Sequence, residues 1–155
     1  QVCNRLSATL DILPTVADII QAPLPKHKID GVSLLPLLKN QPGANPRDHL
    51  YYYYRKNSLE AVREDHWKLV LPHEHRSYEG VLPGNDGFPG PYRQGQTGLA
   101  LYNLRRDPGE EYDVKDLYPE VVRQLQVLAE TARVDLGDDL TGRVGANVRP
   151  PGRAE

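Results

Sequence analysis

The chain of 155 residues is poor in several residue types, and each shortage excludes a class of protein. Cys3 is the only cysteine, which excludes an internal disulfide and a zinc cluster held by several thiolates. No apolar run approaches the roughly 20 residues that cross a bilayer as a helix. Nineteen basic residues stand against 21 acidic ones, so the chain has no basic field for non-specific binding to nucleic acid.

Proline and glycine are plentiful, with 14 and 13 copies, and they indicate long irregular connections because neither suits the interior of a helix or strand. The length suffices for one domain with its own core. The chain has no methionine, shows no signal peptide and begins at Gln1, so we expect a processed product or a piece of a longer protein.

Helical spacing of apolar residues occurs near both ends of the chain. Residues 7–21 predict one helix, with Asp11 as its N-cap. A second, short helix capped by Ser33 is expected through Leu38. Residues 119–134 predict the longest helix, whose apolar face is formed by Val122, Leu125, Leu128, Ala129 and Ala132.

The middle of the chain predicts an antiparallel sheet. Its four β-prone segments are residues 50–54, 59–63, 67–71 and 99–104. Short turns join the first three, and such turns suit only antiparallel neighbours. Residues 72–98 are expected to be a long loop, of a length that is often functional. The fold class is therefore α+β: a four-stranded antiparallel sheet packed against one long C-terminal helix and preceded by short helices.

The most concentrated polar cluster is His73-Glu74-His75-Arg76. Histidine changes its charge near neutral pH, and arginine pairs with sulfate or carboxylate through two parallel donors. The spacing places both histidines on one side of an extended segment. His73, His75 and Arg76 are therefore candidate substrate-binding residues at a pocket rim. A solvated loop start and a metal-binding role for the histidines are the alternatives.

Two acidic groups favour turns over metal sites. Residues 85–87 read Asn-Asp-Gly without the regular acidic spacing of an EF-hand loop. Residues 135–139 hold three aspartates around Gly137, which is typical of a helix cap followed by a turn. No catalytic residue and no metal ligand is predicted from either group.

The tyrosine run and Arg63 also have structural interpretations. Tyr51 to Tyr54 could form a carbohydrate-stacking platform, but alternation sends only half of the rings to each face of the sheet, so core packing is the simpler interpretation. Arg63 lies among apolar neighbours and is expected to pair with Asp107 or Glu110.

Five short stretches, in this order, resemble the C-terminal part of sulfatases of the alkaline-phosphatase superfamily. They are Asp-Ile-Leu-Pro-Thr at 11–15, Ile-Asp-Gly-Val-Ser-Leu at 29–34, Ala-Val-Arg at 61–63, Trp-Lys-Leu at 67–69, and Leu-Tyr-Asn-Leu with Asp-Pro-Gly-Glu at 101–110. The segment from Asp135 to Arg143 resembles the tail of arylsulfatase and N-acetylgalactosamine-6-sulfatase-like members.

The resemblance implies three parts: the end of the large sulfatase domain and a crossover in residues 1–46, the small sheet with its helix in 47–134, and an extended tail in 135–155. In that family the large domain carries calcium and a formylglycine made from cysteine. Here Cys3 is followed two positions later by Arg5, where the formylglycine motif has proline or alanine. We therefore expect Cys3 to be an ordinary residue and this chain to hold neither cofactor.

The resulting prediction is a C-terminal fragment of a sulfatase for aryl or sugar sulfates. Its role would be structural, with part of the substrate-pocket rim but without the catalytic centre. The expected partners are the N-terminal catalytic sulfatase domain and a sulfated carbohydrate, with no nucleic acid and no membrane, in a periplasmic or secreted location. The alternative is a stand-alone glycan-binding or interaction module derived from a sulfatase.

Overall fold

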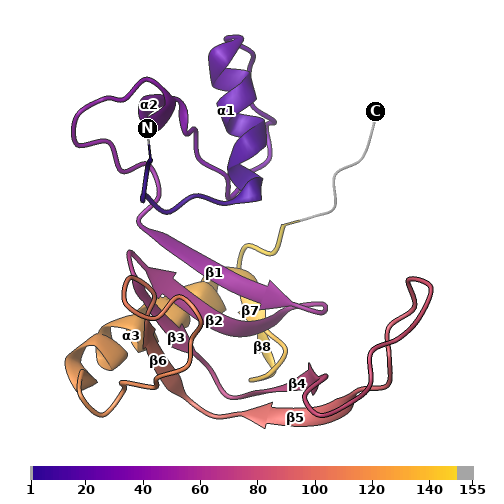
Figure 1. Ribbon diagram of the computed structural model, residues 1–155. Coiled ribbons are helices and arrows are strands. Elements are labelled where there is room, and N and C mark those ends of the chain that lie inside the picture. The colour runs from indigo at the N-terminus through magenta and orange to yellow at the C-terminus, as the bar shows by residue number, and fades with distance from the viewer. Residues whose placement is uncertain (1, 150–155) are drawn as a thin grey trace.

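The computed structural model describes residues 2–149 and confirms the α+β prediction (Figure 1). A sheet with α3 against one face forms the main body, and α1 and α2 lie beyond the edge strand β1. The elements are η1 (Thr9–Asp11), α1 (Ile12–Ile19), α2 (Leu35–Leu38), β1 (His49–Tyr54), β2 (Ser58–Glu64), β3 (Trp67–Val70), β4 (His73–Ser77), β5 (Arg93–Thr97), β6 (Ala100–Asn103), α3 (Pro119–Leu136), β7 (Gly137–Asp138) and β8 (Arg143–Val144).

The main sheet has the order β1-β2-β3-β6, and every neighbouring pair is antiparallel. A register shift falls between Tyr52 and Tyr53, opposite β2. Tyr51 and Tyr53 pack toward the α3 side of the sheet, whereas Tyr52 packs with Ala61 and its neighbours on the other face. The tyrosine run therefore divides between the two faces, as alternation predicts.

The dry core lies between the main sheet and α3. Fully buried strand residues meet the apolar face of the helix, which presents Leu125, Ala129 and Ala132, with Val122 and Leu128 partly buried beside them. The predicted helix and its apolar face are confirmed, because a row of residues at spacings of three and four can bury itself against a sheet without distorting either element.

The N-terminal helices are held by polar contacts. The fully buried Asp11 carboxylate accepts hydrogen bonds from Arg47 Nε at 2.9 Å, from the Val32 N–H at 3.0 Å and from the Ala8 N–H at 2.9 Å. Asp11 stands at the N-cap position of α1, but its side chain makes no capping bond to that helix. Its predicted capping role in α1 is wrong because the carboxylate is committed to Arg47, to the distant amide of Val32 and to the amide of Ala8, three residues earlier in the chain.

Close backbone packing completes the N-terminal segment. A Cβ at Gly31 would lie 2.1 Å from the Leu10 carbonyl oxygen, so only glycine fits there. Thr15 Oγ1 accepts the Leu34 N–H at 2.9 Å. Ser33 Oγ accepts the Leu35 N–H at 3.2 Å, but the N-cap of α2 is Leu34, so the prediction of Ser33 as the cap is off by one residue.

Residues 72–98 are not a loop throughout, so that prediction was wrong. β4 and β5 form an antiparallel hairpin that projects from the body as an arm (Figure 1). At its tip Asp86 and Gly87 both have positive φ, the turn that Asn-Asp-Gly favours. The sequence did not predict this hairpin because its strands carry almost no apolar side chains. Prediction from hydrophobic periodicity depends on such side chains.

The segment after α3 is more ordered than the predicted extended tail. β7 and β8 pair as a two-residue antiparallel ladder, and the Ala146 and Asn147 amides return to the Val134 and Asp135 carbonyls at 2.9 and 2.8 Å. Residues 150–155 of the predicted tail lie outside the described residues. No helix within residues 2–149 has the length and apolar character to span a membrane.

Candidate functional site

The three predicted site residues all lie on β4, but they do not share one face. His73 and His75 are half-buried on one side of the hairpin, whereas Arg76 is exposed on the other. His75 faces Gly95 across the ladder, and a Cβ at Gly95 would lie 2.7 Å from the ring, so glycine makes room for this histidine. Thr97 Oγ1 lies 3.2 Å from His75 Nδ1 and fixes the ring orientation.

His73 stands at a polar cavity of about 320 Å³ on the sheet face opposite α3. Its Nδ1–H donates to the Leu71 carbonyl at 2.6 Å, and its Nε2 lies 3.3 Å from Glu60 Oε2. The other charged, hydroxyl and aromatic side chains around this cavity are Tyr52, Lys68, Thr97, Tyr102 and Glu110. This cavity therefore combines a histidine, a lysine, two carboxylates and two tyrosines.

Lys68 is the central cation of that cavity. Its Nζ donates to both carboxylate oxygens of Glu110, at 2.7 and 2.9 Å, and lies 4.9 Å from the centre of the Tyr52 ring. The predicted pairing of Arg63 is wrong, because Arg63 Nε donates to the Asp65 carbonyl instead. Glu110 follows β6, and β3, which carries Lys68, lies between β6 and the strand of Arg63.

Arg76 contributes to a second hollow of about 390 Å³, shared with Tyr53, Tyr54 and Arg55. Its guanidinium carbon lies 4.8 Å from the centre of the Tyr92 ring. The predicted cluster thus divides between two places: the histidines lie on the half-buried face of the hairpin, and the arginine joins the end of β1. Sequence spacing predicted the side of the strand correctly for the histidine pair, as period two requires.

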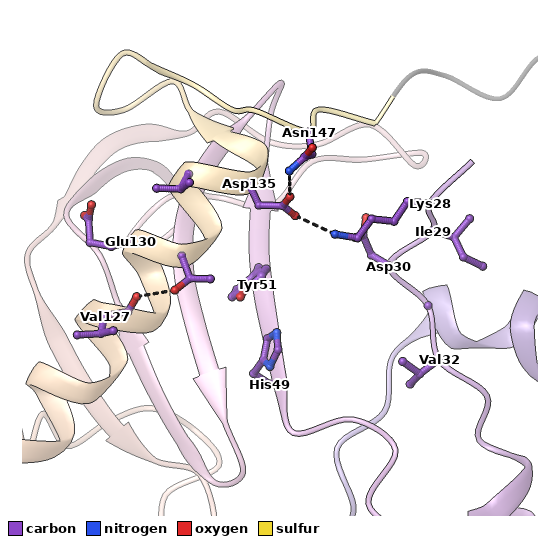
Figure 2. A pocket seen from close by; sticks show the side chains of 13 residues that line it. Lys28, Ile29, Asp30, Val32, His49, Tyr51, Val127, Glu130, Asp135 and Asn147 are labelled. Atoms are coloured by element: carbon purple, nitrogen blue, oxygen red, sulfur yellow. Dashed lines mark hydrogen bonds and ion pairs between the residues drawn. The ribbon is translucent and has the colours of Figure 1, made fainter. Parts of the chain in front are cut away.

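A third, wider hollow of about 780 Å³ lies between residues 28–32, β1 and α3 (Figure 2). Figure 2 shows Asp135 at its edge, where the carboxylate contacts Asn147 Nδ2 at 2.7 Å and Lys28 Nζ at 3.6 Å. Hydrogen bonds from Arg149 and Asn147 lower the pKa of Asp135. Burial raises the pKa of Tyr51 in the groove, and the charges of nearby aspartates add to this effect.

Sequence reasoning missed this groove because its walls come from parts of the chain that are about 100 residues apart. Residues 29–34 contribute to one of these walls and stand out in the sequence only for their resemblance to the family. The groove is lined by both apolar and charged side chains, and at its edge the Asp135 carboxylate pairs with Lys28 and Arg149.

The residues present do not fit the cofactors that the family resemblance implies. Within residues 2–149 no three histidine, cysteine, aspartate or glutamate side chains gather as a metal site requires. Cys3 is exposed and has Arg5 in place of the small residue of the formylglycine motif.

Comparison with known proteins gives one consistent family. Residues 45–152 match the family model for the C-terminal region of aryl-sulfatase. The chain is 33% identical over 135 residues to arylsulfatase A of Homo sapiens, covering 82% of this chain and 26% of that enzyme. It is 31% identical over 145 residues to N-acetylgalactosamine-6-sulfatase of Mus musculus, covering 84% of this chain and 27% of that enzyme.

The fold also resembles a solved structure from work on the metabolism of multiple glycosaminoglycans by Bacteroides thetaiotaomicron. It has a TM-score of 0.54 and 25% identity, over 79% of this chain and 24% of that one. The chain thus spans about a quarter of the length of the relatives it matches. It belongs to the sulfatase family and corresponds to the C-terminal region of a larger sulfatase.

Proposed function

We propose that this chain is the structural C-terminal part of a sulfatase that hydrolyses sulfate esters of sugars or aryl alcohols, and that the reaction centre lies in the preceding part of the longer protein. The names of the relatives, arylsulfatase A and N-acetylgalactosamine-6-sulfatase, support this substrate class. The same kinship supports a periplasmic or secreted location for the whole enzyme.

One observation carries the structural role: α1 turns its apolar stripe outward. Five large apolar side chains on one side of α1 and its C-cap are between 47% and 66% exposed: Ile12, Leu13, Val16, Ile19 and Ile20. The buried side of the same helix carries Pro14, Thr15 and Ala17. A contiguous apolar stripe of this kind marks an interface. We infer that it packs against the N-terminal catalytic part of the sulfatase.

The sheet cavity around His73 supports a second element of the proposal. Its mixed charges and tyrosines suit a polar ligand, and Lys68 and His73 face it with the carboxylates of Glu110 and Glu60 beside them. His75, on the same face, extends this polar surface along the hairpin. We propose that His73 and His75 contribute to the rim of the substrate pocket, and that Arg76 extends the rim on the other face.

The test compares this chain with the full-length protein in an aryl-sulfate hydrolysis assay with calcium. We expect turnover from the full-length protein and none from residues 1–155. In the full-length protein, Val16→Asp places a carboxylate in the α1 stripe and should abolish soluble active enzyme. Val144→Asp, at a position that is 92% exposed on β8, is the matched control and should keep activity.

Robust turnover by residues 1–155 alone would overturn the proposal. A stand-alone module needs no partner for α1, so wild-type solubility and activity of the full-length Val16→Asp variant would contradict the proposed interface and favour that alternative.

A further inference from the structure

Two arginines line one hollow between the end of β1 and the β4–β5 arm. Arg55 follows β1 in the turn to β2, and Arg76 lies on β4. Together with Tyr53 and Tyr54 they line the hollow of about 390 Å³ described above. Segments that are about 20 residues apart in the sequence thus place two guanidinium groups around one concave surface.

These two cations are not neutralised within the described part of the chain. Among residues 2–149, neither Arg55 nor Arg76 forms an ion pair with a carboxylate, and both are exposed. Several other arginines do have such partners, for example Arg47, Arg133 and Arg149. Two like charges around one hollow attract an anion, and a guanidinium fork matches the oxygens of sulfate or carboxylate.

The adjoining surface of the hairpin is aromatic and rich in amides. Tyr92 and Tyr78 lie edge to face with ring centres 6.4 Å apart, and Arg76 lies over Tyr92. Gln94 pairs with Arg76 in the ladder and is exposed on the same face, where its Nε2 donates to Glu74 Oε2 at 3.2 Å and its amide oxygen is left as an acceptor. Tyrosine rings offer flat apolar surface with a polar tip, and amides donate and accept hydrogen bonds, which together suit a sugar ring.

We propose that Arg55 and Arg76, with Tyr54 and Tyr92, bind an anionic group on a sugar ring of an extended glycan, at a site separate from the ring whose ester is cleaved. The anion is a sulfate or a carboxylate. The inference rests on the proposed function, because it takes the substrate to be a sulfated carbohydrate.

Isothermal titration of the 155-residue chain tests this site, with circular dichroism as the check that each variant folds. The probes are a chondroitin 6-sulfate tetrasaccharide, the unsulfated chondroitin tetrasaccharide and inorganic sulfate. We expect saturable binding of the sulfated tetrasaccharide that weakens with added salt. Arg55→Ala and Arg76→Ala should each weaken it about tenfold, the value of one charge-assisted hydrogen-bonded contact. Arg106→Ala, at an exposed arginine outside the hollow, should leave it unchanged.

Equal binding of both tetrasaccharides would keep the site and assign the carboxylate as the recognised anion. Binding of inorganic sulfate as tight as that of the tetrasaccharide would overturn the glycan assignment. No binding at millimolar tetrasaccharide, or equal binding by the wild type and both variants, would overturn the site. An aryl sulfate carries no second sugar, so the hydrolysis assay on the full-length protein tests the proposed function separately.

Discussion

α1 and α3 are both amphipathic helices, yet they turn their apolar faces to opposite environments. α3 buries Leu125, Ala129 and Ala132 against the sheet, whereas α1 exposes Ile12, Val16 and Ile20 and buries its smaller side. The contacts that hold the α1 segment are mainly polar and centre on Asp11. The sheet and α3 thus complete a core by themselves, while the N-terminal segment needs a partner to bury its apolar surface.

Breaking the polar attachment should have the largest effect. Arg47→Ala leaves the buried Asp11 carboxylate without its cation, and removing one partner of a buried pair costs about 3–5 kcal/mol. Because about 1.4 kcal/mol corresponds to a factor of ten, we expect amide exchange in α1 to accelerate at least about a hundredfold. The amides of β3 should keep their protection. Arg106→Ala is the control. Unchanged exchange in α1 would show that the attachment does not depend on this pair.

The apolar core should respond next. Leu125→Ala removes a fully buried side chain from between α3 and the sheet, which costs about 3 kcal/mol. Val127→Ala, on the same helix but 67% exposed, should cost no more than about 0.5 kcal/mol. Urea unfolding followed by circular dichroism measures both. Equal losses would mean that α3 does not supply the core.

Acid should weaken the N-terminal segment before it weakens the core. Burial on its own raises the pKa of Asp11, but hydrogen bonds from Arg47, Val32 and Ala8 lower it below its ordinary 3.8. A lowered folded-state pKa gives stability that is present above the unfolded value and is lost as pH falls through the folded value. The protection of α1 amides, relative to their intrinsic exchange rate at each pH, should therefore decrease as the pH falls below about 4. An α1 exchange profile that does not diverge from that of β3 between pH 5 and 3 would contradict this.

The smallest effect concerns the link between β1 and the end of α3. The Tyr53 hydroxyl donates to the Gly137 carbonyl at 2.8 Å, and Tyr53→Phe should cost about 1 kcal/mol in urea unfolding. Burial, together with the negative charge of Asp138, raises the pKa of Tyr53 to about 12. Spectrophotometric titration of the variant should therefore lack one phenol that ionises near pH 12. Loss of a phenol titrating near pH 10 instead would contradict the burial of this side chain.

The sequence predicted the elements that bury an apolar face, because periodicity reports burial. The four strands of the main sheet and α3 are of this kind. It did not predict β4 and β5, whose ladder is held by backbone pairing under polar side chains. Nor could it assign the direction of the α1 stripe, since spacing shows that a face exists but not what covers it.

The candidate site shows the same limit. Alternation placed His73 and His75 on one face, but only the fold separates Arg76 from them, brings Arg55 into one hollow with Arg76 and sets Lys68 beside Glu110. The Lys68 pairing depends on strand order, which a single sequence does not reveal. Side chains brought together across a sheet leave no local spacing for sequence analysis to detect.

The tight fit of Gly31 on the Leu10 carbonyl has a consequence for how this chain is recognised. Two of the sequence stretches that identify the family contain Asp11, Thr15 and Gly31. These three residues hold the segment of residues 29–34 against the start of α1. Their contacts position one backbone segment against another. A related protein without hydrolase activity could therefore keep these residues for packing. Their presence identifies the family but does not show that a chain is active.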